Sequence, residues 1–152
     1  MANTILVSNV ENNDCISQRI NEITVYQRQY IRTILSKLAE VNKDNALSIY
    51  YYIINEQNTF NIKESTKESK IKVLVWLSNH FQDNKRFKDM VKNDIISYLH
   101  KLRKPITEDP TQSWIGTYNI RQLIIVSFFK WFYNPYEPNF RARNIPACRP
   151  FI

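Results

Sequence analysis

The sequence predicts an all-α fold, and three observations support this prediction. The chain of 152 residues contains one glycine, Gly116, whereas the hairpin turns of β-rich folds usually recruit several glycines for positive φ. Apolar residues recur at three- and four-residue spacing over most of the chain, as they do in amphipathic helices. The composition, 43% hydrophobic and 13% aromatic, is sufficient to bury one sizeable core.

The first helix is expected from about Asp14 to Val41, because apolar residues repeat along one helical face there. The members of this face are Ile16, Ile20, Ile23, Tyr30, Ile34, Leu38 and Val41. A polar cluster follows and ends the helix. The second helix is expected from about Asp44 to Glu56, with Asp44 or Asn45 as its N-cap.

Three more helices are expected further along the chain. One begins at Ser65 or Thr66, where Ser65 and Glu68 have capping-box spacing, and buries Ile71, Leu74, Leu77 and Phe81. The next covers about 92–104 and buries Ile95, Ile96, Leu99 and Leu102. The last covers about 111–133, ends before Pro135, and turns inward Ile120, Leu123, Ile124, Phe128 and Trp131.

The charge and the helices together suggest three parts. Residues 1–42 form an extension that is largely one amphipathic helix, 43–137 form a helical domain, and 138–152 form an extended basic linker. The formal net charge of +7 is uneven, since residues 1–62 sum to −1 and residues 63–152 sum to +8. An anionic partner is therefore expected to bind the second part of the chain.

Several classes of function are excluded or disfavoured by composition. One glycine excludes phosphate-binding loops and dinucleotide fingerprints, which need two or three. No apolar run is long enough for a membrane span and no signal-peptide pattern occurs, so a cytoplasmic protein without membrane contact is expected. Cys15 and Cys148 are expected to be free thiols. Two histidines without an acidic cluster predict no metal site, and no cofactor is expected.

Two basic or polar helix edges suit the phosphates and base edges of duplex DNA. Lys63, Lys67 and Lys70 follow one another at i, i+4 and i+7, with Thr66 beside them. Thr117, Asn119 and Arg121 form the second edge, on the last helix. The linker adds two further candidate DNA contacts, Arg141 and Arg143.

Three segments carry a resemblance to a known family. They are the helix opened by Ser65 and Thr66, the segment 91–99 (VKNDIISYL), and the last helix with its ending 128–135 (FFKWFYNP). Together they cover about 44–138. They resemble the N-terminal, SAM-like core-binding domain of tyrosine recombinases and phage-type integrases, most closely archaeal integrases.

The resemblance implies a compact four-helix SAM-like core-binding bundle with an extra N-terminal helix and a basic C-terminal linker. Such a domain clamps double-stranded recombination-site DNA through two helices, here the helices that carry the two polar edges. The resemblance further implies that this chain is a fragment of such a recombinase, without its catalytic domain. The chain is therefore expected to bind DNA without cutting it and to have no catalytic residues.

Two alternatives stay open. In the first, the chain is a helical protein-interaction or oligomerisation module, and its N-terminal helix exposes an apolar stripe for self-association formed by Ile20, Ile23, Ile34 and Leu38. In the second, the chain is a stand-alone enzyme that uses His100, Arg103 and Tyr133, three residues of the types found in recombinase active sites.

Overall fold

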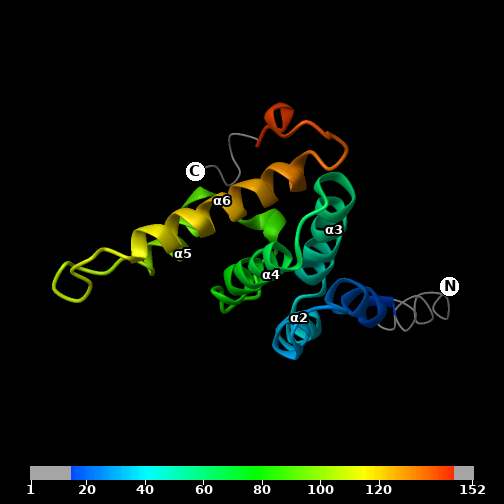
Figure 1. The fold of residues 1–152 in the computed structure, drawn as a ribbon, viewed down its shortest axis with the longest axis horizontal. Coiled ribbons are helices and arrows are strands. Elements are labelled where there is room, and N and C mark those ends of the chain that lie inside the picture. The colour runs from blue at the N-terminus through cyan, green and yellow to red at the C-terminus, as the bar shows by residue number, and fades with distance from the viewer. Residues whose placement is uncertain (1–14, 146–152) are drawn as a thin grey trace. The chain divides into compact units, whose positions relative to one another are not determined.

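The structure is a computed structural model that describes residues 15–145. Within this range every regular element is an α-helix or a 3-10 helix, which confirms the all-α fold class. The chain divides between Val75 and Trp76 into two compact units, and α4 (Glu64–Asn79) runs through the division. The elements are shown in Figure 1, and each unit is described by itself below.

The first unit contains a helix over residues 15–24, α2 (Gln29–Val41), α3 (Lys43–Phe60) and most of α4. The single helix expected from Asp14 to Val41 is therefore wrong. The Thr24 hydroxyl donates to the carbonyl of Ile20 at 2.6 Å, and Arg28 adopts an extended conformation with ψ of 150°. A β-branched run at 23–25 has low helix propensity, and a threonine bonded back to its own helix favours a bend.

The break shifts the buried face of α2 by one residue. Tyr30 and Val41, expected inside, are 49% and 58% exposed, whereas Ile31, Leu35 and Leu38 are buried. Side chains of the turn also hold α4, because the Gln27 amide donates to the Glu64 carboxylate at 2.7 Å. The two N-terminal helices thus belong to the core of the first unit, while a boundary after residue 42 stays a prediction.

Helix α3 begins and ends at asparagines. The side chain of Asn42, rather than Asp44 or Asn45, accepts the N-terminal hydrogen bond from the amide of Asn45 at 3.2 Å. At the other end Asn61 adopts a left-handed conformation with φ of 48°, and its amide donates to the carbonyl of Gln57. Asparagine tolerates this conformation better than most residues, so α3 ends there.

Helix α4 begins one residue earlier than expected. The amide of Lys67 donates to the carbonyl of Lys63 at 3.0 Å, so Ser65 already lies inside the first turn and does not act as the cap. Three of the four residues of its expected apolar ladder, Ile71, Leu74 and Leu77, are fully buried, whereas Phe81 follows the end of the helix and is only partly buried. The sequence pattern therefore located the core face of this helix but not its first residue.

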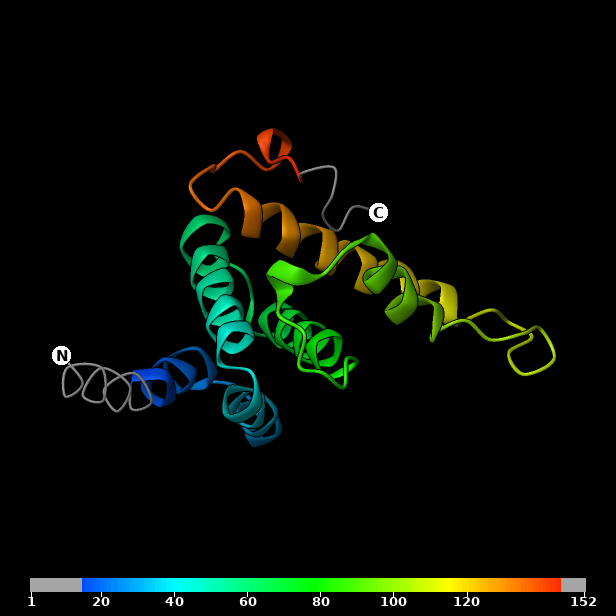
Figure 2. The same cartoon turned by 180° about the vertical axis from the view of Figure 1, so that it is seen from behind.

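The second unit is built around an aromatic core. It contains the end of α4, η1 (Phe87–Asp89), α5 (Lys92–His100), α6 (Trp114–Tyr133) and η2 (Phe140–Ala142), and Figure 2 shows α5 beside α6. The ring of Phe87 packs edge-on against Phe128 with centroids 4.8 Å apart. The ring centroids of Phe129 and Phe87 are 6.2 Å apart. The short η1 helix therefore carries a central core residue that the sequence pattern did not reveal.

The first turn of α6 is fixed by Asp109. Its carboxylate accepts hydrogen bonds from the Ser113 hydroxyl, the Thr111 hydroxyl and the amide of Trp114, at 3.0, 3.1 and 3.2 Å. Desolvation opposes ionisation, but these hydrogen bonds prevail and lower the pKa of Asp109. A carboxylate at a helix N-terminus is also favoured by the helix dipole. Helix α6 consequently begins at Trp114, three residues after the expected start.

The segment after α6 folds back instead of extending as a linker. The Asn134 side-chain amide donates to the carbonyl of Asn144 at 2.7 Å, and the ammonium of Lys130 lies 4.4 Å from the ring centroid of Phe140. Arg143 is 2% exposed, and its Nε donates to the carbonyl of Glu137 at 2.7 Å. Cys148 lies outside the described residues, and Cys15 is a free thiol.

Candidate interaction surfaces

The structure buries two of the four residues proposed for the first DNA-binding edge. Lys63 and Thr66 are exposed, but Lys67 is 2% exposed and its ammonium lies 2.9 Å from the carboxylate of Glu64. Lys70 is also largely buried, and its contacts are described next. Their buried positions leave the two ammonium groups little access to a phosphate backbone.

Lys70 lies inside the first unit between α3 and α4. Its ammonium donates to the Tyr52 hydroxyl at 2.9 Å and lies 3.8 Å from the carboxylate of Glu56, whose side chain is 6% exposed. Desolvation lowers the pKa of Lys70, although the neighbouring Glu56 acts in the opposite direction. The residue is therefore part of a buried polar network in this unit.

The remaining DNA-binding candidates lie in the second unit, and the structure separates exposed from packed ones. Thr117, Asn119 and Arg141 are exposed. The guanidinium of Arg121 lies 4.6 Å from the ring centroid of Trp76 and donates to the Tyr98 hydroxyl at 3.1 Å. Arg143 is buried, as described above. Two of these five residues, Arg121 and Arg143, therefore support the packing of the unit.

The three residues proposed for a stand-alone enzyme differ in their exposure and contacts. His100 is exposed at the end of α5. Arg103 lies over two rings of α6, 5.8 Å from the Trp114 centroid and 5.7 Å from that of Tyr118. The ring of Tyr133 stacks on Phe129 at 6.3 Å. Arg103 and Tyr133 thus contribute to aromatic packing. No group of three histidine, cysteine or acidic side chains within 15–145 could hold a metal ion.

The prediction that the N-terminal helix exposes an apolar stripe for self-association is wrong. Ile20, Ile23 and Leu38 are 4%, 0% and 2% exposed, because the helix over 15–24 and α2 turn them into the core of the first unit. No helix among the described residues is both long and apolar enough to cross a bilayer.

Helix α6 exposes apolar side chains, two of which, Ile120 and Leu123, the sequence pattern placed inside. Ile120 and Leu123 are 59% and 70% exposed, and Ile115 is 43% exposed. At 3.6 residues per turn these residues fall, with Gly116 and Asn119, within an arc of about 140°. We call these five residues the α6 face. Its position explains the wrong expectation, because the helix is apolar on more than one side and a single inward stripe does not describe it.

Two further properties suit the α6 face to contact with a protein. Helix α6 contains no acidic residue, and its first turn carries no charge that would need desolvation. A Cβ added at Gly116 would meet no atom within 4 Å, so the fold itself does not require this glycine. The bare backbone there allows a close approach by another helix.

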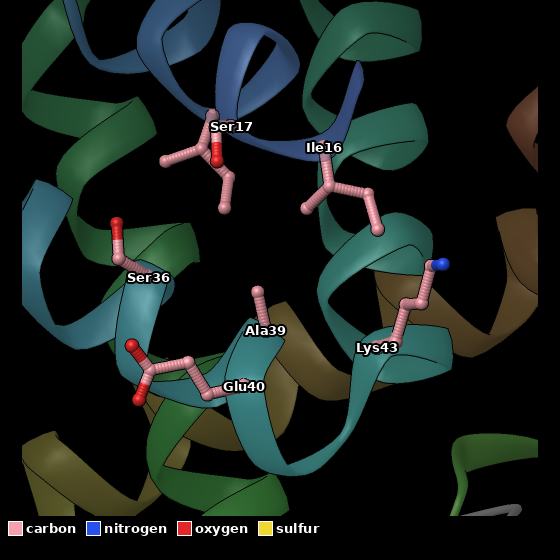
Figure 3. A pocket seen from close by; sticks show the side chains of 7 residues that line it. Ile16, Ser17, Ser36, Ala39, Glu40 and Lys43 are labelled. Carbon is pink, nitrogen blue, oxygen red and sulfur yellow. The ribbon is translucent and has the colours of Figure 1, made fainter. Parts of the chain in front are cut away.

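The first unit contains a pocket of about 410 Å³, shown in Figure 3. The helix over 15–24 contributes Ile16, Ser17 and Ile20, α2 contributes Ser36, Ala39 and Glu40, and α3 contributes Lys43. We call it the N-terminal pocket. Two of its apolar residues, Ile16 and Ile20, are buried in the core, whereas the charged residues lie toward the surface.

A comparison with models of protein families shows which family this chain is similar to. Residues 13–115 match the model described as "URB1, central HEAT repeat domain", which covers about two thirds of the chain. Comparisons with curated proteins and with solved structures found no match. HEAT repeats are helix pairs that stack on neighbouring pairs into an extended array.

This match overturns the resemblance to tyrosine recombinases. The core-binding domain, the archaeal integrase likeness and the expected role in DNA integration and recombination are therefore wrong. DNA binding, proposed through Lys63, Thr66, Lys67, Lys70, Thr117, Asn119, Arg121, Arg141 and Arg143, loses its support with them. A helical repeat family instead favours the alternative of a protein-interaction module.

Proposed function

We propose that this chain, which belongs to the family of URB1 central HEAT repeat domains, is a helical module that binds another protein. Stacked helical repeats bury apolar faces against their neighbours, and a repeat at the end of an array needs a polar outer face. An exposed apolar face on α6, a helix most of which follows the matched residues 13–115, is therefore a surface on which a further helical element could dock.

The observation that carries the proposal is the exposure of Ile120 and Leu123 on the α6 face. Fully burying an aliphatic side chain contributes about 1.5–3 kcal/mol, so completing the burial of these two contributes roughly 1 kcal/mol each or more. Contiguous apolar surface that a fold leaves exposed often marks a site of protein–protein contact. The cytoplasmic location and the lack of a cofactor stay predictions.

Photo-crosslinking tests this function in cells. With benzoylphenylalanine in place of Leu123 in the full chain, irradiation should give a discrete adduct with another protein. The additional substitution Ile120→Glu should reduce its yield about tenfold or more, because an unpaired carboxylate in an apolar interface costs several kcal/mol.

The control places benzoylphenylalanine at Lys37, which is exposed on α2 and lies outside the α6 face. This position should not give the same adduct. The proposal is wrong if the two positions yield the same products, or if Ile120→Glu leaves the yield at position 123 unchanged while circular dichroism shows a folded chain.

A further inference from the structure

We propose that the N-terminal pocket binds a segment of a partner protein in which a basic and an acidic side chain lie close together. The pocket belongs to the first unit, and the inference concerns a second binding site that is independent of the α6 face. It follows from the size of the pocket, from its apolar floor and from the two oppositely charged residues that line it.

The pocket has the composition of a binding site. Its volume of about 410 Å³ falls within the range of typical ligand pockets, about 300–1,000 Å³. Ile16 and Ile20, 7% and 4% exposed, supply an apolar floor together with Ala39. Two hydroxyls, those of Ser17 and Ser36, line the same pocket. It therefore combines apolar surface with several polar groups.

Glu40 places an exposed carboxylate beside the pocket. It lies in the last turn of α2, where the helix dipole is negative, and this turn contains no basic residue. Within residues 15–145 its carboxylate forms no ion pair. A cation bound in the pocket would relieve this arrangement.

Lys43 places a cation at another edge of the same pocket. It is the first residue of α3, where the helix dipole is positive, and only Asp44 in the same turn offsets it. Its ammonium likewise forms no ion pair within the part of the chain that the structure describes. Figure 3 shows Glu40 and Lys43 on either side of Ala39, so one pocket has both charges at its edge.

These two charges define the chemistry of the occupant. A basic side chain can lay its aliphatic stem on Ile16 and Ile20 while its cation approaches Glu40. A carboxylate of the same segment can then pair with Lys43, and the hydroxyls of Ser17 and Ser36 can exchange hydrogen bonds with either group. A protein segment with adjacent basic and acidic residues provides all of these contacts.

The test is a titration of the full, ¹⁵N-labelled chain with a capped peptide, acetyl-arginyl-alanyl-glutamyl amide, followed by NMR. Saturable shifts are expected at the amides of Ser17, Ser36 and Glu40, with millimolar affinity. Glu40→Gln should weaken binding about fivefold or more, which corresponds to the loss of one charge-assisted contact of about 1 kcal/mol.

Two comparisons make the test specific. Lys43→Gln should weaken binding of this peptide but not of a second peptide in which glutamine replaces the glutamate. Matched controls remove a charge outside the pocket, Lys37→Gln on α2 and Glu108→Gln in the second unit, and should leave the affinity unchanged.

Three results would overturn the inference. The first is the absence of saturable shifts up to about 20 mM peptide, which would limit the binding free energy to a few kcal/mol at most. The second is an affinity for the peptide that Glu40→Gln leaves unchanged. The third is tighter binding of a free zwitterionic amino acid than of the capped peptide. The last result would identify a small-molecule site. None of these measurements uses α6, so failure here and failure of the proposed function are distinguishable.

Discussion

Replacing Lys70 with methionine is expected to lower the free energy of unfolding by about 3 kcal/mol. The side chain of Glu56 is 6% exposed, and Lys70 is the cation that lies beside it, at 3.8 Å. Methionine fills a similar volume but leaves this carboxylate buried without a cation. It also removes the donor that the Tyr52 hydroxyl accepts from. Chemical denaturation measured at neutral pH checks the value.

A second variant separates the loss of charge pairing from a simple packing defect. In the double variant Lys70→Met and Glu56→Gln neither member of this pair carries a charge, so much of the lost stability should return. Equal instability of the single and double variants would contradict the account of this pair. Such a result would indicate that the volume or shape of Lys70, and not its charge, supports the first unit.

Truncating Phe128 to alanine should also be strongly destabilising, by about 3–5 kcal/mol. Its ring is fully buried and packs against Phe87 and Phe132 with centroids 4.8 and 5.7 Å apart. The alanine variant loses the transfer free energy of the ring and leaves a cavity in the aromatic core. Thermal and chemical unfolding of the full chain measure the effect.

The matched control truncates an aliphatic residue of the same helix on its other side. Leu123 is 70% exposed, so Leu123→Ala should change the free energy of unfolding by no more than about 0.5 kcal/mol. A large loss at Leu123 would mean that this side chain is packed in the isolated chain. Taken together, the two variants show which side of α6 is core and which side is free.

The sequence allowed the helices and most of their core faces to be predicted. Positions with a clear three- and four-residue period, such as Ile71, Leu74 and Leu99, are fully buried as expected. The break at residues 25–28 was missed because the same apolar period continues on both sides of it. The hydrogen bond from Thr24 to Ile20, the extended conformation of Arg28 and the one-residue shift of the α2 face reveal that two helices are present.

The spacing of basic residues on a helix was the least reliable guide to which side chains are exposed for binding. The spacing of Lys63, Lys67 and Lys70 describes one stripe, but two of the three ammonium groups lie beside buried or neighbouring carboxylates. Those partners are Glu64 on the same helix and Glu56 on another helix. The pairing with Glu56 depends on how α3 and α4 pack, which a one-dimensional pattern does not contain.

The resemblance to recombinases rested on segments whose composition reflects packing. In the most specific of them, residues 128–135, Phe128, Phe129 and Trp131 are buried. Aromatic and aliphatic residues at helical spacing serve the core of many all-α proteins, so they do not identify a function. The N-terminal pocket was missed for a different reason, since its lining comes from three helices and forms only when they pack.

The most direct test of the proposed interaction measures whether the α6 face is covered in the cell. In a chain with Cys15→Ser, Cys148→Ser and Leu123→Cys, maleimide labelling reports the accessibility of position 123. The account predicts rapid labelling of the purified chain and strong protection of the same chain in intact cells, lost when Ile120→Glu is added. Equally rapid labelling in both settings would contradict the claim that a partner protein docks on this face.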